Sequence, residues 1–106
     1  MFELTLLEEL FEYDQDKLQE YLVLCVEDLG NTLEEIRVAE QTNDEKLLRQ
    51  HLHKLLAVSR QLKVVDLTEM IYAFEARQKS YEQIKVTVFE KIEKLIDHLK
   101  VRTLNS

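Results

Sequence analysis

Proline is absent from this chain of 106 residues, and glycine and cysteine occur once each. Strands joined by tight turns usually need several glycines or prolines, so this scarcity argues against a protein built from β hairpins. The many leucine, glutamate, lysine and glutamine residues favour helix instead, and we expect an all-α fold. The lone thiol of Cys25 has no disulfide partner within the chain, and we expect it to pack as a small apolar side chain.

Long apolar runs are also missing from the chain. No stretch approaches the roughly 20 apolar residues that a membrane-spanning helix needs, and the opening sequence MFELTLLEELFEYD is too acidic for a secretory signal. We therefore expect a cytoplasmic protein, although a domain cut from a membrane receptor would look the same. With 45% hydrophobic residues, the chain can bury one modest core, and we expect residues 1–106 to form a single domain.

Cap-like pairs of residues divide the chain into helices. A short hydroxyl or carboxylate side chain followed three residues later by Glu or Gln is typical of a helix start, because each accepts from free backbone N–H groups. Four such pairs are present: Thr5/Glu8, Thr42/Glu45, Asp66/Glu69 and Ser80/Gln83. The first opens a short helix, which an acidic break separates from a long helix that ends near Gln41. Within that long helix, Gly30 either costs about 1 kcal/mol relative to alanine or permits a close helix crossing.

Apolar residues recur at three- and four-residue spacing on each expected helix, which turns one face inward. The helix at residues 44–63 has its core seam at Leu48, Leu52, Leu55, Ser59 and Leu62. At about 100° per residue, His51 lies about 60° from the centre of this seam and should flank the core. His53 lies about 140° from the centre and about 200° from His51, so its ring should face water. Short connections between such helices predict antiparallel neighbours. We expect an antiparallel up-and-down four-helix bundle with a short additional N-terminal helix lying across one end.

Charge is distributed unevenly along the chain. Residues 46–65 contain five basic residues and no acidic one, although the whole chain has a formal charge of −7, so the remainder carries −12. A positive segment around an exposed His53 suggests a site for a negatively charged group or an acidic partner. Nucleic acid is disfavoured, because the overall charge repels it and no aromatic residues lie among the basic ones. Membrane binding is disfavoured, because the apolar stripes are needed inside the bundle.

The spacing around His53 resembles that of the histidine phosphotransfer (HPt) domain family, small helical proteins that relay phosphoryl groups between response-regulator receiver domains. In the family a leucine follows the phosphorylated histidine by fourteen residues, and a hydrophobic–glutamate pair comes seven residues later. Leu67 and the pair Phe74 and Glu75 occupy these positions, and counting from His51 breaks the register. The resemblance covers nearly the whole chain. It implies that Nε2 of His53 accepts the phosphoryl group from a receiver aspartate, with the metal ion supplied by the receiver.

This chain departs from the family at three positions near His53. The usual lysine three residues after the histidine is Leu56, the glycine that follows is Ala57, and the glycine ten residues after the histidine is Lys63. Loss of the lysine removes a cation that would stabilise the phosphoryl group. Because Lys63 would be strained in a left-handed conformation, we expect the helix end to differ from that of typical relatives.

Basic residues elsewhere on the helix are candidates to replace the missing lysine. Arg49 and Arg60 both lie within about 40° of His53 on the helix surface, and the alternative is that they are merely solvated. Leu56 and Ala57 are expected to form an exposed apolar patch on which a receiver docks. The complete predicted site is the phosphoacceptor His53 with the phosphoryl-supporting or partner-binding residues Arg49, Lys54, Leu56, Ala57 and Arg60.

Two functions remain open at this point. One is a phosphorelay between receiver aspartates through His53; the other is a degenerate HPt-like module that binds a receiver domain or hybrid histidine kinase without accepting phosphate. We expect no enzymatic activity of its own, because no paired carboxylates, nucleophile triad or glycine-rich phosphate loop can be placed. We expect no cofactor and no metal site, since the rings of His51 and His53 diverge too far to share an ion. A monomer is expected, although a leftover apolar stripe could pair two copies.

Overall fold

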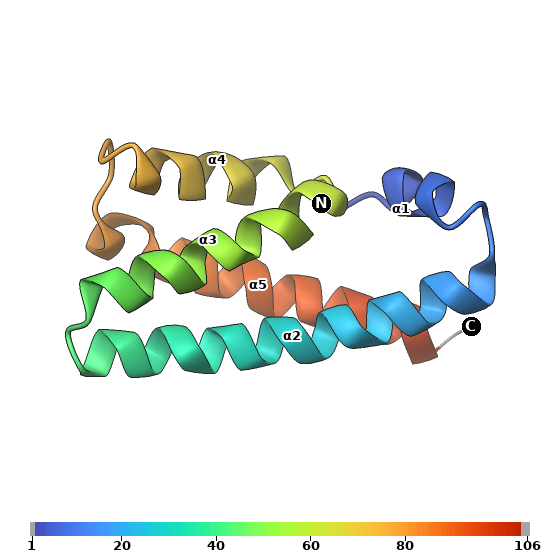
Figure 1. Ribbon diagram of the computed structural model, residues 1–106, viewed down its shortest axis with the longest axis horizontal. Helices are drawn as coiled ribbons and strands as arrows, with labels where there is room; N and C mark the ends of the chain where they lie inside the picture. The colour runs from blue at the N-terminus through green and yellow to red at the C-terminus, as the bar shows by residue number, and fades with distance from the viewer. Residues whose placement is uncertain (1, 105–106) are drawn as a thin grey trace.

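The computed structural model describes residues 2–104, and these residues form five helices joined by short connections (Figure 1). The helices are α1 (Thr5–Leu10), α2 (Gln15–Gln41), α3 (Glu45–Gln61), α4 (Val65–Glu75) and α5 (Tyr81–Leu104). No strand occurs within the described residues, so the expectation of an all-α protein is confirmed. Over the same range, every helix is too short or too polar to cross a membrane.

The four longer helices contact one another in a ring. α2 packs against α3 and α5, α3 packs against α4, and α4 packs against α5. α1 contacts α2 and lies at the end of the molecule where α2 begins and α5 ends (Figure 1). The chain before α1 is tied to the end of α3, because the backbone N–H of Glu3 donates to the carbonyl of Leu62 at 2.7 Å.

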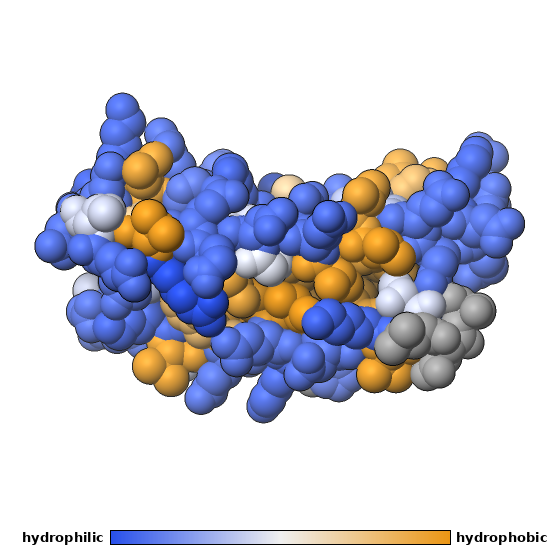
Figure 2. All heavy atoms as spheres, turned by 90° about the horizontal axis from the view of Figure 1, so that it is seen from below, coloured by the Kyte–Doolittle hydropathy of each residue, from blue (hydrophilic) through white to orange (hydrophobic). Residues whose placement is uncertain are grey.

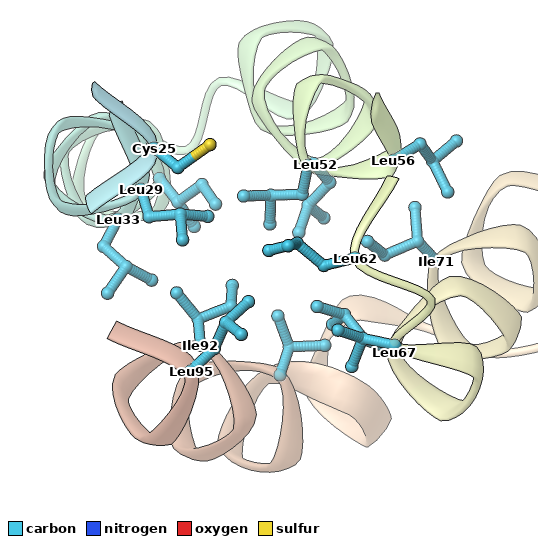
Figure 3. Close-up of a cluster of buried hydrophobic side chains, with 14 of the residues drawn as sticks. Cys25, Leu29, Leu33, Leu52, Leu56, Leu62, Leu67, Ile71, Ile92 and Leu95 are labelled. Carbon is cyan, nitrogen blue, oxygen red and sulfur yellow. The ribbon is translucent and has the colours of Figure 1, made fainter. Parts of the chain in front are cut away.

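Side chains from α2, α3, α4 and α5 converge on one apolar interior, which includes the thiol of Cys25 (Figure 3). The predicted seam of α3 is confirmed, because its members are all 8% exposed or less: Leu48, Leu52, Leu55, Ser59 and Leu62. The hydroxyl of Ser59 donates to the carbonyl of Val64 at 3.1 Å, so its burial leaves no unpaired group. On the outside, the face seen from the side of α2 is mostly hydrophilic, with apolar side chains gathered along its middle (Figure 2).

The helix starts match the predicted caps only in part. The pair Ser80 and Gln83 is confirmed: the N–H of Ser80 donates to the Gln83 side chain at 2.8 Å, and the N–H of Gln83 donates to the Ser80 hydroxyl at 3.3 Å. The prediction for Thr42 is wrong, because Thr42 closes α2. Asp44 caps α3 instead, by accepting from the N–H of Leu47 at 3.0 Å.

Two further predicted caps, Thr5 and Asp66, are also wrong, because both residues lie inside their helices and neither helix has a capping side chain at its start.

The surroundings of Gly30 decide between its two predicted roles. A Cβ built on this residue would meet nothing within 4 Å, so no neighbouring helix approaches closely there. Gly30 therefore acts as an ordinary helix-weakening residue, at a cost of about 1 kcal/mol relative to alanine.

The end of α3 differs from the expected one. Lys63 does adopt a left-handed conformation, with φ of 54°. The N–H of Val64 donates to the carbonyl of Ser59 at 2.9 Å, and the N–H of Lys63 donates to that of Arg60 at 3.2 Å, which is the Schellman pattern. The expectation that strain at Lys63 would change this helix end is thus wrong, because these hydrogen bonds hold a residue with a Cβ where glycine would be relaxed.

Candidate functional site

His53 lies near the middle of α3, and its side chain is 69% exposed. Its Nδ1 lies 2.5 Å from a carboxylate oxygen of Glu75, the last residue of α4. Because an ionised carboxylate can only accept, a neutral His53 ring carries its proton on Nδ1 and presents a lone pair at Nε2. No protein group within residues 2–104 forms a hydrogen bond with this second nitrogen. The expectation that His53 faces solvent is confirmed.

The path of α4 along α3 brings these two side chains together. Near one end of the contact, the hydroxyls of Ser59 and Thr68 lie 2.6 Å apart, and toward the other end His53 meets Glu75. The chain turns back between the two helices through Leu62 and Lys63. Glu75 is therefore placed by the length of α4, whose last residue reaches the ring of His53.

Leu56 does not contribute to the surface around His53. It is 5% exposed and lies between α3 and α4, near Ile71 (Figure 3). The predicted apolar patch is wrong in this respect, because only Ala57 of the two residues is exposed. The reason is rotational: Leu56 stands about 60° from His53 on the side of α3 that α4 covers, and Ala57 stands about 40° away on the other side.

The two candidate arginines are placed differently. The guanidinium of Arg49 lies 4.4 Å from the centroid of the Phe74 ring and pairs with Glu45 at 3.3 Å. Arg49 is thus held against the end of α4, on the same side of α3 as Glu75. Arg60 is exposed, and its side chain has no ion pair or hydrogen bond with any described residue. Arg60 is therefore free to meet an incoming anion, whereas Arg49 would first have to leave its present contacts.

The opposite side of α3 carries His51. Its side chain is 15% exposed, and its Nδ1 lies 2.8 Å from the Glu35 carboxylate of α2, without the geometry of a directed hydrogen bond. Lys54 donates to the same carboxylate at 3.0 Å, and this hydrogen bond lowers the pKa of Glu35 below its ordinary value. The expected divergence of His51 and His53 is confirmed. Lys54 points toward α2, so it does not join the cations on the His53 side.

Glu75 has a position in the HPt-like pattern, but no role was predicted for its side chain. It stands 22 residues from His53, and only the packing of α4 on α3 shows that the two touch. Within the described range, no group of three or more His, Cys, Asp or Glu side chains could hold a metal ion. Comparisons of the chain with family models, with curated proteins and with solved structures found no match.

Proposed function

We propose that this protein is a histidine phosphotransfer protein that relays a phosphoryl group between receiver aspartates in a two-component phosphorelay, with His53 as the phosphoacceptor. The observation that carries the proposal is the pair of His53 and Glu75. The ring is 69% exposed and is held through Nδ1 at 2.5 Å, so Nε2 is the nitrogen left for reaction. An accessible lone pair on an oriented ring is what a nucleophilic acceptor needs.

The proposal includes the arrangement of the helices as an antiparallel up-and-down four-helix bundle with α1 as an additional helix. The ring of contacts among α2, α3, α4 and α5 and the short connections between them support this arrangement. In it, the chain acts as one cytoplasmic, monomeric domain that presents His53. The partner is a response-regulator receiver domain or a hybrid histidine kinase, and the domain supplies no cofactor of its own.

Phosphoryl transfer requires one bond to form and one to break. The Nε2 lone pair of His53 attacks the phosphorus of an aspartyl phosphate, and the P–O bond to the aspartate breaks, so that the carboxylate leaves with the electron pair. The ring then carries both the Nδ1 proton and the phosphoryl group. Its positive charge is balanced by the Glu75 carboxylate at 2.5 Å, which also fixes the tautomer, as the aspartate does for the histidine of a serine protease triad. The reverse of this step delivers the group to a second receiver.

A degenerate module that binds a receiver without accepting phosphate is the second candidate. The leucine at position 56 favours it, because this position supplies no cation to the phosphoryl group. The ion pair of Arg49 with Glu45 also favours the degenerate module, because this guanidinium already has an anionic partner. The unpaired side chain of Arg60 supports the first candidate, since it can approach an anion without losing another partner.

One labelling experiment separates the two candidates. The wild type and the variants His53→Gln and His51→Gln are incubated with a receiver domain that carries a radiolabelled phosphoryl group. We expect acid-labile, alkali-stable label on the wild type and on His51→Gln, and none on His53→Gln. Binding of the receiver without label on the wild type would support the degenerate module. Label on His53→Gln would show that the phosphoacceptor has been misplaced.

A further inference from the structure

A pocket of about 330 Å³ opens between the start of α3 and the loop that joins α4 to α5. Three basic side chains line it, those of Arg49, Arg77 and Lys79, together with the rings of Phe74 and Tyr81. These elements meet at one end of the molecule, where α3 and α5 begin and α4 ends (Figure 1). Arg49 precedes His53 by four residues, which is about 6 Å along the helix axis. The pocket therefore lies beside the candidate phosphoacceptor.

Main-chain hydrogen bonds fix the loop that carries two of these cations. The N–H of Arg77 donates to the carbonyl of Phe74 at 3.0 Å, and the N–H groups of Gln78 and Lys79 both donate to that of Ala73, at 2.8 and 3.2 Å. The backbone from α4 to α5 thus has a defined path although its side chains are exposed. On the facing wall, the stacking of Arg49 on Phe74 holds the third cation in place.

The positive charge of the pocket is not balanced by the protein itself. Neither Arg77 nor Lys79 forms an ion pair with a carboxylate anywhere in the described part of the chain. Glu45 is the one acidic residue in the pocket lining that the structure describes, and it pairs with Arg49 at 3.3 Å. The whole chain has a net charge of −7. A local excess of unpaired cations therefore directs an anionic ligand to this pocket rather than to the rest of the surface.

We infer that this pocket binds an acidic side chain of the protein that docks on His53, as an anchoring contact beside the reacting centre. The inference rests on the proposed function for the identity of the partner. Guanidinium groups match a carboxylate with two parallel hydrogen bonds, and the rings of Phe74 and Tyr81 can cover the methylene groups of a Glu side chain. The pocket lies at the small end of the range for ligand sites, which suits one side chain better than a cofactor.

Binding of a fluorescein-labelled oligoglutamate peptide tests the pocket without any partner. Two double variants that remove the same charge are compared: Arg77→Gln with Lys79→Gln in the pocket, and Lys94→Gln with Lys100→Gln on exposed positions of α5. We expect the pocket variant to bind the peptide roughly tenfold more weakly than the wild type, and the α5 variant to bind it about as well. Amide NMR shifts on titration should centre on residues 77–81.

Three results of this experiment would overturn the inference. Equal loss of binding in the two variants would show attraction to the whole protein rather than to the pocket. Equal binding of an oligoglutamine peptide would show that charge is not recognised. Saturable binding of inorganic phosphate at lower concentration than the peptide would assign the pocket to a small free anion. Far-ultraviolet circular dichroism of both variants confirms that they are folded.

A transfer assay with the labelled receiver keeps this inference separate from the proposed function. The pocket variant should raise the receiver concentration needed for the half-maximal rate and leave the limiting rate unchanged, because His53 itself is intact. Equal concentration dependence in the two double variants, with label on His53, would overturn the anchor while the proposed function stands. Peptide binding at the pocket with no label on the wild type would reject the proposed function and leave the acidic-side-chain site in place.

Discussion

His51 and His53 lie two residues apart on α3, and each has a glutamate of a neighbouring helix beside its Nδ1. His53 is 69% exposed beside Glu75 of α4, whereas His51 is 15% exposed beside Glu35 of α2. The rotation of about 200° between the two positions puts one ring at the rim of the contact with α4 and the other inside the contact with α2. A carboxylate neighbour alone therefore does not mark a reactive histidine. What differs is how much of the ring solvent can reach, and that Nδ1 is hydrogen-bonded in His53 but not in His51.

The largest effect on stability is expected at Leu56, which fills the contact between α3 and α4 next to His53. Replacement by alanine should lower the free energy of unfolding by about 2–5 kcal/mol, because it leaves a cavity between α3 and α4. The neighbouring exposed change Ala57→Ser should stay within about 0.5 kcal/mol. Urea unfolding measures both. A negligible effect at Leu56 would mean that its side chain is not buried between α3 and α4. Leu56 would then belong to the predicted docking surface, and the difference between it and the exposed Ala57 would disappear.

A smaller effect, on rate, is expected from the two glutamates. Glu75→Ala should slow labelling of His53 by about 10–100-fold, as losing the group that orients a functional imidazole commonly does. Glu35→Ala should leave the rate nearly unchanged, because its carboxylate contacts His51 and Lys54. Glu75→Gln should recover most of the rate, since its amide oxygen can accept from Nδ1. Equal slowing by the two alanine variants would remove the functional distinction between the histidines.

Chemical modification compares the two rings without a partner protein. Diethyl pyrocarbonate acylates accessible imidazole nitrogen, so His53 should react roughly tenfold faster than His51, which must wait for local opening of the structure. His98 provides the internal control, because it is also exposed and its Nδ1 also has a neighbour, the carbonyl of Lys94 at 2.6 Å. Peptide mass spectrometry reads all three sites. Similar rates at His51 and His53 would contradict the difference in burial.

Helical periodicity predicted which residues of α3 form the core, because a 3.6-residue repeat fixes each direction from the helix axis. It placed the seam, the flanking His51 and the exposed His53 correctly. It failed at Leu56, which lies only about 60° from His53, because periodicity cannot tell how far a neighbouring helix reaches around the surface. The burial of Leu56 beside Ile71 shows that α4 covers this flank (Figure 3). The contact of His53 with Glu75 was not predicted for the same reason, because the two residues are 22 positions apart in the sequence and meet only in the folded structure.

The caps were predicted less well than the core because several residues near each helix end could fill the same role. Around the start of α3, both Thr42 and Asp44 have a suitable oxygen. The end of α2 decided between them: the Thr42 hydroxyl donates backward to the carbonyl of Val38 at 3.0 Å, so Asp44 accepts from the next helix. Of the four predicted pairs, only Ser80 and Gln83 form the two reciprocal hydrogen bonds that the pattern requires.

A stabilising effect of about 1 kcal/mol is expected from Lys63→Gly. The left-handed φ of 54° at this residue costs a side chain with a Cβ about that much, and glycine adopts it freely. Ala57→Gly, within the helix, should be destabilising by a similar amount. Thermal unfolding measures both, and the labelling rate of His53 should not respond to Lys63→Gly. A slower rate would mean that this departure from the HPt pattern affects the site as well as the backbone.

The smallest effect concerns the carboxylate on the His51 side. Because the hydrogen bond from Lys54 lowers the pKa of Glu35, this pair stabilises the fold above the ordinary carboxyl pKa of about 4.3. That stability is lost as the pH falls through the lower folded value. A double-mutant cycle of Glu35→Gln and Lys54→Gln should give a coupling of about 0.2–1 kcal/mol at pH about 7. The coupling should shrink as the pH falls through the lowered pKa of Glu35, which urea unfolding at a series of acidic pH values measures. Coupling that persists in acid would mean that shape rather than charge holds Lys54 toward α2. The lysine could then turn to the His53 side at little electrostatic cost, and the two sides of α3 would no longer be separate.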